Sequence, residues 1–443
     1  MDKSPRDLND TIFAPSTAPG RAGVAVLRVS GTSAARAVEQ LCGTPPKEPR
    51  KVYLTVFHDI QGTLIDRGLV LWFAAPSSFT GEDVAEFHVH GGRAIVGAML
   101  AALSRVPGLR PAERGEFTRR AVENGKLDLT QAEALADLID AETDAQRRQA
   151  LRQYDGALGA LYENWRSRLI RACALAEATL DFPEEEIPDG TMTGVRQAIS
   201  DISQQIQEHL SDSRRGEILR EGVNLTVFGS PNVGKSSLLN ALAKRDVAIV
   251  SETAGTTRDV IEVRLDLGGY PVIVADTAGL REAEGPIEAE GVRRALERSK
   301  SADIALLLLD ASAPDPYFSL PSGEATEADL VVWNKIDVAA APKHGIGISV
   351  ETGAGIPALL EAISEKCDNI LKLKTNDAPL TRARHRGHLE SALAALIRAQ
   401  DAPAQELLGE DLRLALRALG QITGKVDVED ILDVVFREFC IGK

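Results

Sequence analysis

The feature that most constrains this chain is a glycine-rich loop, Gly-Ser-Pro-Asn-Val-Gly-Lys-Ser, at residues 229–236. Residues 224–228, Asn-Leu-Thr-Val-Phe, predict a strand before the loop, and the residues from Gly234 onward predict a helix after it. In this setting, the loop amides and the positive end of the helix point at phosphate oxygens. The loop therefore predicts a parallel α/β domain that binds the phosphates of a nucleotide.

The side chains of this loop have distinct expected roles. We expect Lys235 to reach the β- and γ-phosphates as a catalytic cation, and the Ser236 hydroxyl to ligate Mg²⁺. The predicted nucleotide contacts in and after the loop are Asn232, Val233, Gly234, Lys235, Ser236 and Ser237.

Three more motifs follow in the order expected of a GTP-hydrolysing domain. Asp-Thr-Ala-Gly at residues 276–279 follows an apolar run, so we expect it at the carboxyl end of a strand, where ligands collect. Asn-Lys-Ile-Asp occupies residues 334–337, and Asp337 can accept two hydrogen bonds from guanine that adenine cannot donate in that pattern. Ser-Val-Glu at residues 349–351 resembles the last base-contacting loop of such domains. These motifs predict contacts from Asp276, Thr277, Ala278, Gly279, Asn334, Lys335, Asp337, Ser349, Val350 and Glu351.

The hydrolytic machinery departs from the Ras-like pattern at one position. Leu280 stands where Ras-like proteins place a water-orienting glutamine, and leucine cannot orient water. Thr257 is the expected second hydroxyl on the Mg²⁺ side. Arg258 is the local cation in place of an arginine finger, although its neighbour Asp259 could pair with it.

The pattern of expected strands and helices changes three times along the chain. Residues 1–118 alternate strand-like runs with alanine-rich helical ones, and residues 119–215 are helical. Residues 216–375 alternate strands with helices around the nucleotide motifs, and residues 376–443 return to helix. The predicted fold is multidomain α/β: an N-terminal α+β domain, then a mostly helical domain interrupted by a P-loop, Ras-like GTPase domain.

Within the second segment, residues 127–139 carry leucine and alanine at helical spacing. Thr130 and Glu133 fit a capping box, in which the hydroxyl and the carboxylate satisfy the opening amides of a helix. The pattern predicts a helix in this stretch, with Thr130 and Glu133 at its capping box.

The composition narrows the function classes. A formal net charge of −15 argues against general nucleic-acid binding, which needs a positive surface, but leaves room for a local basic patch. Arginine clusters at residues 147–152, 166–171 and 382–386 are expected to be solvated helix faces more often than nucleic-acid sites. No apolar run approaches the roughly 20 residues of a membrane span, and no apolar signal region opens the chain, so we expect a cytoplasmic protein. Metal-ligand spacing is absent from the four cysteines, Cys42, Cys173, Cys367 and Cys440.

Segments outside the nucleotide motifs select one family. The nucleotide motifs alone fit many GTPases, but over nearly its whole length the chain resembles the tRNA-modification GTPase family MnmE, also called TrmE. The matching segments include residues 19–31, 78–83, 115–118, 126–129, 231–235, 253–259, 276–281 and 439–443.

The resemblance implies a potassium ion where other GTPases use an arginine. In the family, an Asn of the phosphate loop and carbonyls of an adjacent loop hold this ion, which neutralises charge developing on the phosphates. The matching potassium ligands are Asn232, Ser251, Thr253 and Thr256, and the matching magnesium ligands are Ser236 and Thr257. The adjacent loop also supplies nucleotide contacts from Ser251, Glu252, Thr253, Ala254, Gly255, Thr256 and Thr257.

The resemblance also supplies a water-orienting group and a mode of activation. Glu288 matches the family's catalytic glutamate by its distance from Asp276, with Glu282, Glu284 and Glu290 as nearby alternatives. In the family, potassium-dependent dimerisation of the nucleotide domains stimulates hydrolysis, so the resemblance implies a homodimer.

The N-terminal segment resembles the family's tetrahydrofolate-binding and dimerisation domain. Arg28, Glu86, Lys126 and the terminal Lys443 match its folate contacts. A paired cation and carboxylate suit the edge of a pterin ring, which presents donors and acceptors together. The resemblance implies a 5-formyl or 5,10-methylene derivative of tetrahydrofolate.

Three further residues have competing interpretations. Cys440 lies four residues from the end, but the following Ile-Gly-Lys does not fit a prenylation signal. The resemblance implies that Cys440 is placed in the folate site and has a catalytic role there. The alternative is an inert surface cysteine. His88 and His90 alternate onto one strand face; without a third ligand nearby, a structural or folate-pocket role is favoured over a metal.

The resemblance implies a tRNA-modifying enzyme. With a flavin-dependent partner, MnmG (GidA), in a heterotetramer, the family adds carboxymethylaminomethyl or aminomethyl groups at carbon 5 of the wobble uridine in certain tRNAs. The required cofactors would be GTP, Mg²⁺, K⁺ and the folate. The alternative is a regulatory or ribosome-assembly GTPase that uses the same switch without folate chemistry.

Overall fold

The computed structural model groups the chain into two compact units. The first contains residues 1–136, 159–166 and 419–443, and the second contains residues 137–158 and 167–418. The structure describes residues 10–181, 190–212, 214–245, 247–249, 262–276, 302–317, 328–372, 378–426, 432, 435–436 and 439–442.

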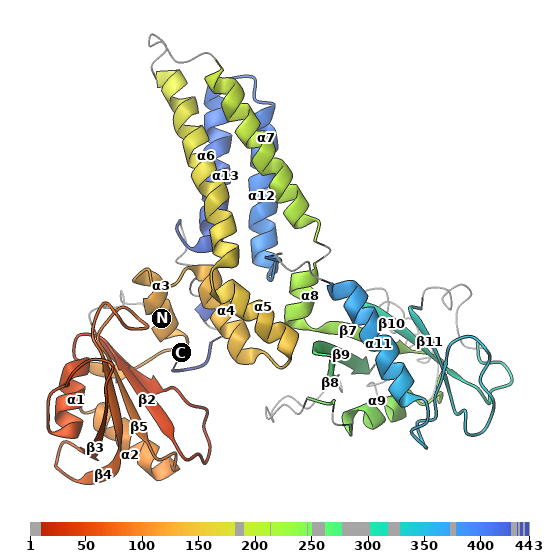
Figure 1. Cartoon of the computed structure of the whole chain (residues 1–443), viewed down its shortest axis with the longest axis horizontal. Helices are drawn as coiled ribbons and strands as arrows, with labels where there is room; N and C mark the ends of the chain where they lie inside the picture. The colour runs from red at the N-terminus through yellow and green to blue at the C-terminus, as the bar shows by residue number, and fades with distance from the viewer. Residues whose placement is uncertain are drawn as a thin grey trace, which may run out of the picture. The chain divides into compact units, whose positions relative to one another are not determined.

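The first unit is built on a six-stranded sheet, of which Figure 1 labels β2 to β5. The strand order is β3-β4-β5-β2-β1-β6, and only β1 and β6 pair in parallel. Residues alternate between its two faces, so Leu27 and Phe87 are buried with helices α1 and α2 in one core. The elements are β1 (Thr11–Pro15), β2 (Ala25–Ser30), α1 (Ala34–Cys42), β3 (Val52–His58), β4 (Leu64–Phe73), β5 (Val84–Val89), α2 (Arg93–Leu103), β6 (Leu109–Pro111) and α3 (Glu116–Glu123).

Four long helices lie side by side in a bundle (Figure 1). Cross-helix hydrogen bonds hold them: Arg168 donates to Gln205 at 3.1 Å, and Arg413 donates to Glu177 at 2.7 Å. Within the described residues, none of the helices combines the length and apolar character that a bilayer crossing requires. The bundle helices are α6 (Ala157–Asp181), α7 (Thr191–Leu210), α12 (Ala383–Gln400) and α13 (Gln405–Thr423), with the shorter α4 (Leu129–Asp140), α5 (Asp144–Tyr154) and α8 (Arg215–Glu221).

The nucleotide motifs lie on a second six-stranded sheet, of order β12-β11-β10-β7-β9-β8. All pairs are parallel except the β8–β9 hairpin. The central strand β10 is a continuous buried apolar run and β7 is buried at five of its six residues, as expected for a sheet with both faces covered, which confirms the predicted P-loop domain. The elements are β7 (Val223–Phe228), α9 (Lys235–Ala243), β8 (Glu262–Leu267), β9 (Tyr270–Asp276), β10 (Ile304–Asp310), β11 (Leu330–Asn334), β12 (Ile346–Gly347) and α11 (Ile356–Leu371).

The start of α4 corrects one prediction. The Asp128 carboxylate accepts a hydrogen bond from the Gln131 amide at 2.8 Å, and the Gln131 side chain accepts one from the Asp128 amide at 3.0 Å. The capping box therefore pairs Asp128 with Gln131, and the predicted pair of Thr130 and Glu133 is wrong. Thr130 lies inside the first turn, where its hydroxyl donates to Asp128 at 2.6 Å.

Candidate functional site

The phosphate loop follows β7, the strand between β9 and β10, and its shape depends on close backbone packing. Gly229 and Gly234 both have positive φ, 151° and 101°. A Cβ on Gly229 would overlap the Leu308 carbonyl oxygen, and one on Gly234 would overlap the side-chain amide of Asn334. Glycine at these two positions therefore lets the loop lie directly against β10 and β11.

The Lys235 ammonium is held inside the loop. Lys235 opens α9, and its Nζ donates to the carbonyl oxygens of Gly229 at 3.0 Å and Ser230 at 2.9 Å. Ser236 and Ser237 follow in the first, exposed turn of the same helix. The structure thus brings the predicted phosphate cation and the predicted Mg²⁺ hydroxyl to one helix N-terminus, where the helix dipole favours anions.

Asn334 ties this loop to the motif expected to contact the base. Its side chain is buried, with 3% exposed. The amide nitrogen donates to the Val233 carbonyl oxygen at 2.8 Å, and the amide oxygen accepts from the Val350 amide at 3.2 Å. Sequence reasoning predicted Asn334 as a nucleotide contact; the structure adds a positioning role that links three predicted loops.

A carboxylate that sequence reasoning missed holds the neighbouring lysine. Lys335 has φ 65°, and its Nζ lies 2.6 Å from Asp310 Oδ2 at the end of β10. Burial alone would raise the pKa of Asp310, but hydrogen bonds from Lys335 and Ser312 outweigh it and lower that pKa. Asp337 lies exposed two residues further on. Asp310 could have been predicted as a site residue from sequence, because it ends a buried parallel strand as Asp276 does.

The strand register places the remaining motif. Asp276 is the last residue of β9 and pairs with Val227 of β7, one residue before Phe228, which ends that strand. The Asp-Thr-Ala-Gly motif therefore begins at the same sheet edge as the phosphate loop. The predicted site residues outside the described residues are Ser251, Glu252, Thr253, Ala254, Gly255, Thr256, Thr257, Thr277, Ala278, Gly279, Glu288 and Lys443.

In the first unit, the structure brings Arg28 and Glu86 together on the sheet face opposite the α1 and α2 core. They are register partners on β2 and β5, and the guanidinium makes two contacts of 3.0 Å with Glu86 Oε1. The guanidinium carbon also lies 5.5 Å from the Phe79 ring centroid and 5.7 Å from that of Phe117. The pair is thus oriented and backed by aromatic rings, while both side chains keep partial solvent access.

Lys126 lies against the loop that carries Phe79. A Cβ on Gly81, where φ is 80°, would sit 3.1 Å from Lys126 Cε. Asn124 fixes the same loop by donating to the Thr80 carbonyl oxygen at 2.7 Å. Three of the predicted folate residues therefore share one region of the first unit, with the Phe79 loop between them.

Each of the two histidines faces a carboxylate: His88 lies in β5, and His90 lies directly after it. His88 Nε2 lies 3.5 Å from Glu86, and His90 Nδ1 lies 2.9 Å from Asp66. Across the part of the chain that the structure describes, no group of three metal-ligating side chains forms. His88 thus lies beside the Arg28–Glu86 pair, and its Nε2 makes no hydrogen bond among the described residues.

A buried ionic network that sequence reasoning missed supports this face. Arg120, 3% exposed, donates to Asp10 at 2.7 Å, Glu82 at 3.0 Å and Glu116 at 3.2 Å. Burial alone would raise the pKa of Glu116, but hydrogen bonds and charge from Arg110 and Arg120 lower it. Because Asp10 directly precedes β1, Glu82 lies in the Phe79 loop and Glu116 opens α3, the network fixes three segments around the Arg28–Glu86 pair.

The chain's tail docks on the same unit. Gly442 has φ 101°, and a Cβ there would overlap the carbonyl oxygen of Pro15. The Ser16 hydroxyl donates to the Gly442 carbonyl at 3.1 Å, and the Gly115 amide donates to the Cys440 carbonyl at 3.4 Å. Cys440 is exposed on this docked segment. The tail therefore reaches the end of β1, the strand that pairs with the Arg28 strand.

Comparison with known proteins covers nearly the whole chain. Residues 11–126 match the family described as "GTP-binding protein TrmE N-terminus", and residues 129–440 match "MnmE helical domain". The chain is 55% identical to the tRNA modification GTPase MnmE of Parvibaculum lavamentivorans, over 98% of this chain and 100% of that one. It is 53% identical to the protein of that name from Rhodospirillum rubrum, over 98% and 99%. It is also 46% identical to the mitochondrial 5-taurinomethyluridine-[tRNA] synthase subunit GTPB3 of Danio rerio, over 98% and 93%.

The double hydrogen bond of Asn334 generates a prediction. Asn334→Asp keeps the acceptor for Val350 but loses the donor to Val233 and buries a carboxylate beside that carbonyl. We expect the affinity for GDP to fall by roughly 10- to 100-fold, measured by titration with a fluorescent GDP analogue. Val338→Ala, at an exposed position of the same loop, is the control and should bind normally. An affinity within about twofold of the parent protein would contradict the positioning role.

Proposed function

Because this chain belongs to the MnmE family of tRNA modification GTPases, we propose that it couples GTP hydrolysis to modification of carbon 5 of the wobble uridine in certain tRNAs. The chain is a GTP-hydrolysing enzyme. One observation carries the proposal: the chain holds both a P-loop site and, in its first unit, the Arg28–Glu86 pair with the docked tail. The proposal includes domains at residues 1–118, 119–215, 216–375 and 376–443.

In the proposed hydrolytic site, each residue has one task. Lys235 turns from the loop carbonyls to the β- and γ-phosphates, and Asp337 accepts hydrogen bonds from guanine. Ser236 and Thr257 hold Mg²⁺, with Asp276 acting through water. When bound, Mg²⁺ and K⁺ supply positive charge at the phosphate oxygens.

Asn232 is the proposed side-chain ligand of potassium. It has φ 64°, a left-handed conformation that asparagine tolerates better than most residues. Its exposed side chain lies in the phosphate loop, where a carboxamide oxygen suits a hard cation. Ser251, Thr253 and Thr256 complete the proposed ligand set, and Glu288 is the proposed group that orients the attacking water.

The first unit is the proposed site of the one-carbon folate. Arg28 and Glu86 present a donor and an acceptor side by side, which suits a pterin edge, and Phe79 and Phe117 restrain the guanidinium. Lys126 and Lys443 add positive charge for the folate carboxylates. The docked tail supports the proposal that Cys440 acts in this site. In the proposed assembly, a homodimer joins the flavin-dependent partner MnmG in a heterotetramer that modifies tRNA.

Nucleoside analysis tests the whole proposal. Cells lacking this chain should lose carboxymethylaminomethyl and aminomethyl groups at carbon 5 of uridine, measured by mass spectrometry of digested tRNA. Complementation with the Lys235→Ala variant should fail to restore them. Lys244→Ala removes an exposed lysine at the other end of α9 and should restore them fully. Unchanged nucleosides in the deleted cells would refute the proposed modification.

Potassium dependence is tested at Asn232. We expect GTP hydrolysis in KCl to exceed that in NaCl by about tenfold or more, because the ion stabilises the transition-state charge. Asn232→Gly removes the carboxamide and still permits the positive φ, whereas alanine would add backbone strain. Its rates in the two salts should be equal. A salt difference that survives in this variant would place the potassium ligand elsewhere.

Folate binding is tested by calorimetry with 5-formyltetrahydrofolate. Arg28→Ala should weaken binding by roughly tenfold or more, because it removes charge-assisted hydrogen bonds. Lys51→Ala, at an exposed lysine of the same unit, is the control and should bind normally. If Arg28→Ala leaves folate binding unchanged, the folate site lies elsewhere on the protein. Absence of binding by the parent protein would favour a regulatory or ribosome-assembly GTPase.

A further inference from the structure

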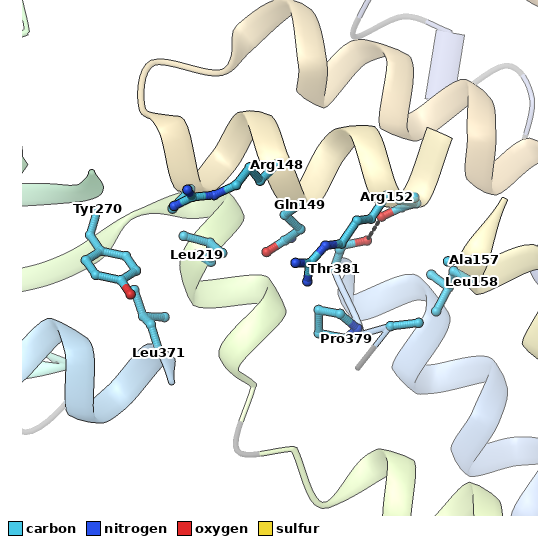
Figure 2. Close-up of a pocket in the computed structure, with 13 residues that line it drawn as sticks. Arg148, Gln149, Arg152, Ala157, Leu158, Leu219, Tyr270, Leu371, Pro379 and Thr381 are labelled. Carbon is cyan, nitrogen blue, oxygen red and sulfur yellow. Dashed lines mark hydrogen bonds between the residues drawn. The ribbon is translucent and has the colours of Figure 1, made fainter. Parts of the chain in front are cut away.

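A pocket of about 270 Å³ lies within the second unit (Figure 2), and it shares no lining residue with either proposed site. One wall is α5, and the opposite walls come from the segments that join the helical bundle to the nucleotide sheet. These segments contribute Leu219 of α8, Leu371 at the end of α11, and Pro379. The pocket therefore contacts both connections between the two parts of this unit.

The α5 wall presents two arginines and a glutamine at helical spacing, as Figure 2 shows. Arg148 is held by Asp144 at 2.7 Å and is more than half exposed. Arg152, one turn further on, has no hydrogen-bond or ion-pair partner among the residues that the structure describes. Arg152 is therefore the cation that is available at the rim of the pocket.

Gln149 is the second polar group of the pocket that is available to a ligand. This side chain is 9% exposed, and its amide nitrogen donates to the Gly216 carbonyl oxygen at 3.0 Å. Its carbonyl oxygen is buried and has no hydrogen-bond partner within the described part of the chain. Figure 2 draws this carboxamide between Leu219 and Arg152. Because buried carbonyl oxygens are normally satisfied, this oxygen calls for an N–H or O–H group from outside the protein.

The other polar groups of the pocket are already engaged. Gln153 accepts a hydrogen bond from the Thr381 hydroxyl at 2.9 Å. Burial and a hydrogen bond with Asp368 raise the pKa of Tyr270, so its hydroxyl stays protonated and is committed to that partner. The ring of Tyr270 and the neighbouring leucines then form an apolar wall. A ligand would meet one cation, one acceptor and this wall.

We propose that the pocket binds a small organic anion that carries an N–H or O–H donor on a flat apolar body. The anion would pair with Arg152, its donor would satisfy the Gln149 oxygen, and the apolar body would cover Leu219 and Tyr270. The volume suits a ligand of one or two rings. This binding site is additional to the GTP and folate sites, and its test does not depend on either.

The same features disfavour RNA as the occupant. An RNA backbone needs several unpaired cations along a surface. On this helix, Arg147 and Arg148 are both paired with Asp144, at 2.6 and 2.7 Å. A concave site with one available cation and one buried acceptor fits a small molecule instead.

Three related probes test the inference on the full-length protein by ligand-observed NMR titration. Indole-3-carboxylate combines the anion, the N–H donor and the flat body, and should bind saturably. 1-Methylindole-3-carboxylate lacks the donor, and indole lacks the charge. Each should bind roughly tenfold more weakly. If indole-3-carboxylate shows no saturable binding, or binds no better than the two analogues, the proposal is wrong.

Two protein variants locate the binding. Arg152→Met removes the charge but keeps the length of an exposed side chain, and it should weaken indole-3-carboxylate binding roughly tenfold. Arg147→Met changes a neighbouring arginine of α5 that does not line the pocket, so binding should be unaffected. Equal weakening by both variants would indicate general charge attraction and overturn the assignment. A melting temperature for each variant separates lost binding from lost folding.

Discussion

Parallel pairing of β7 with β9 and β10 decides where the nucleotide-contacting residues of this chain can lie. In such a sheet, every strand delivers its carboxyl end to the same edge, so segments far apart in sequence converge there. The phosphate loop follows β7, Asp276 ends β9 and Asn334 ends β11. Asn334 then fixes the relative positions of the loops around it, because its carboxamide forms hydrogen bonds with two of them.

In the first unit, a different feature of the sheet positions the site residues. Its strands are mostly antiparallel, so alternation of residues separates an apolar face from a polar one. Leu27 and Phe87 lie in the core, and their neighbours Arg28 and Glu86 are thereby directed to the other face. The Arg28–Glu86 pair keeps partial solvent access, and the Arg120 network fixes the segments around it.

Local motifs made many of the strands and site residues predictable from sequence. The strands before the phosphate loop and before Asp276 were expected because apolar runs preceded glycine-rich or acidic turns. The Arg120 network was not predictable in the same way, because its acidic partners at positions 10 and 82 are distant in the chain. The α4 cap failed for a smaller reason: Asp128 and Thr130 are both good caps, and only the backbone path shows which one precedes the helix. The unpartnered oxygen of Gln149 depends on the packing of segments that are distant in the chain, and it leaves no sequence signal.

The β8–β9 hairpin links the nucleotide sheet to α5. Its turn is Gly268-Gly269, with φ 64° and 90°, and the Gly269 carbonyl accepts a hydrogen bond from the Ala145 amide at 3.1 Å. At the other end of the hairpin, β9 finishes at Asp276. An antiparallel pair joined by a two-residue turn is stiff along its length, so a displacement of β9 at Asp276 is carried to the first turn of α5. A GTPase cycle that repositions Asp276 would therefore act on the helical bundle through this hairpin, next to the pocket that Tyr270 lines.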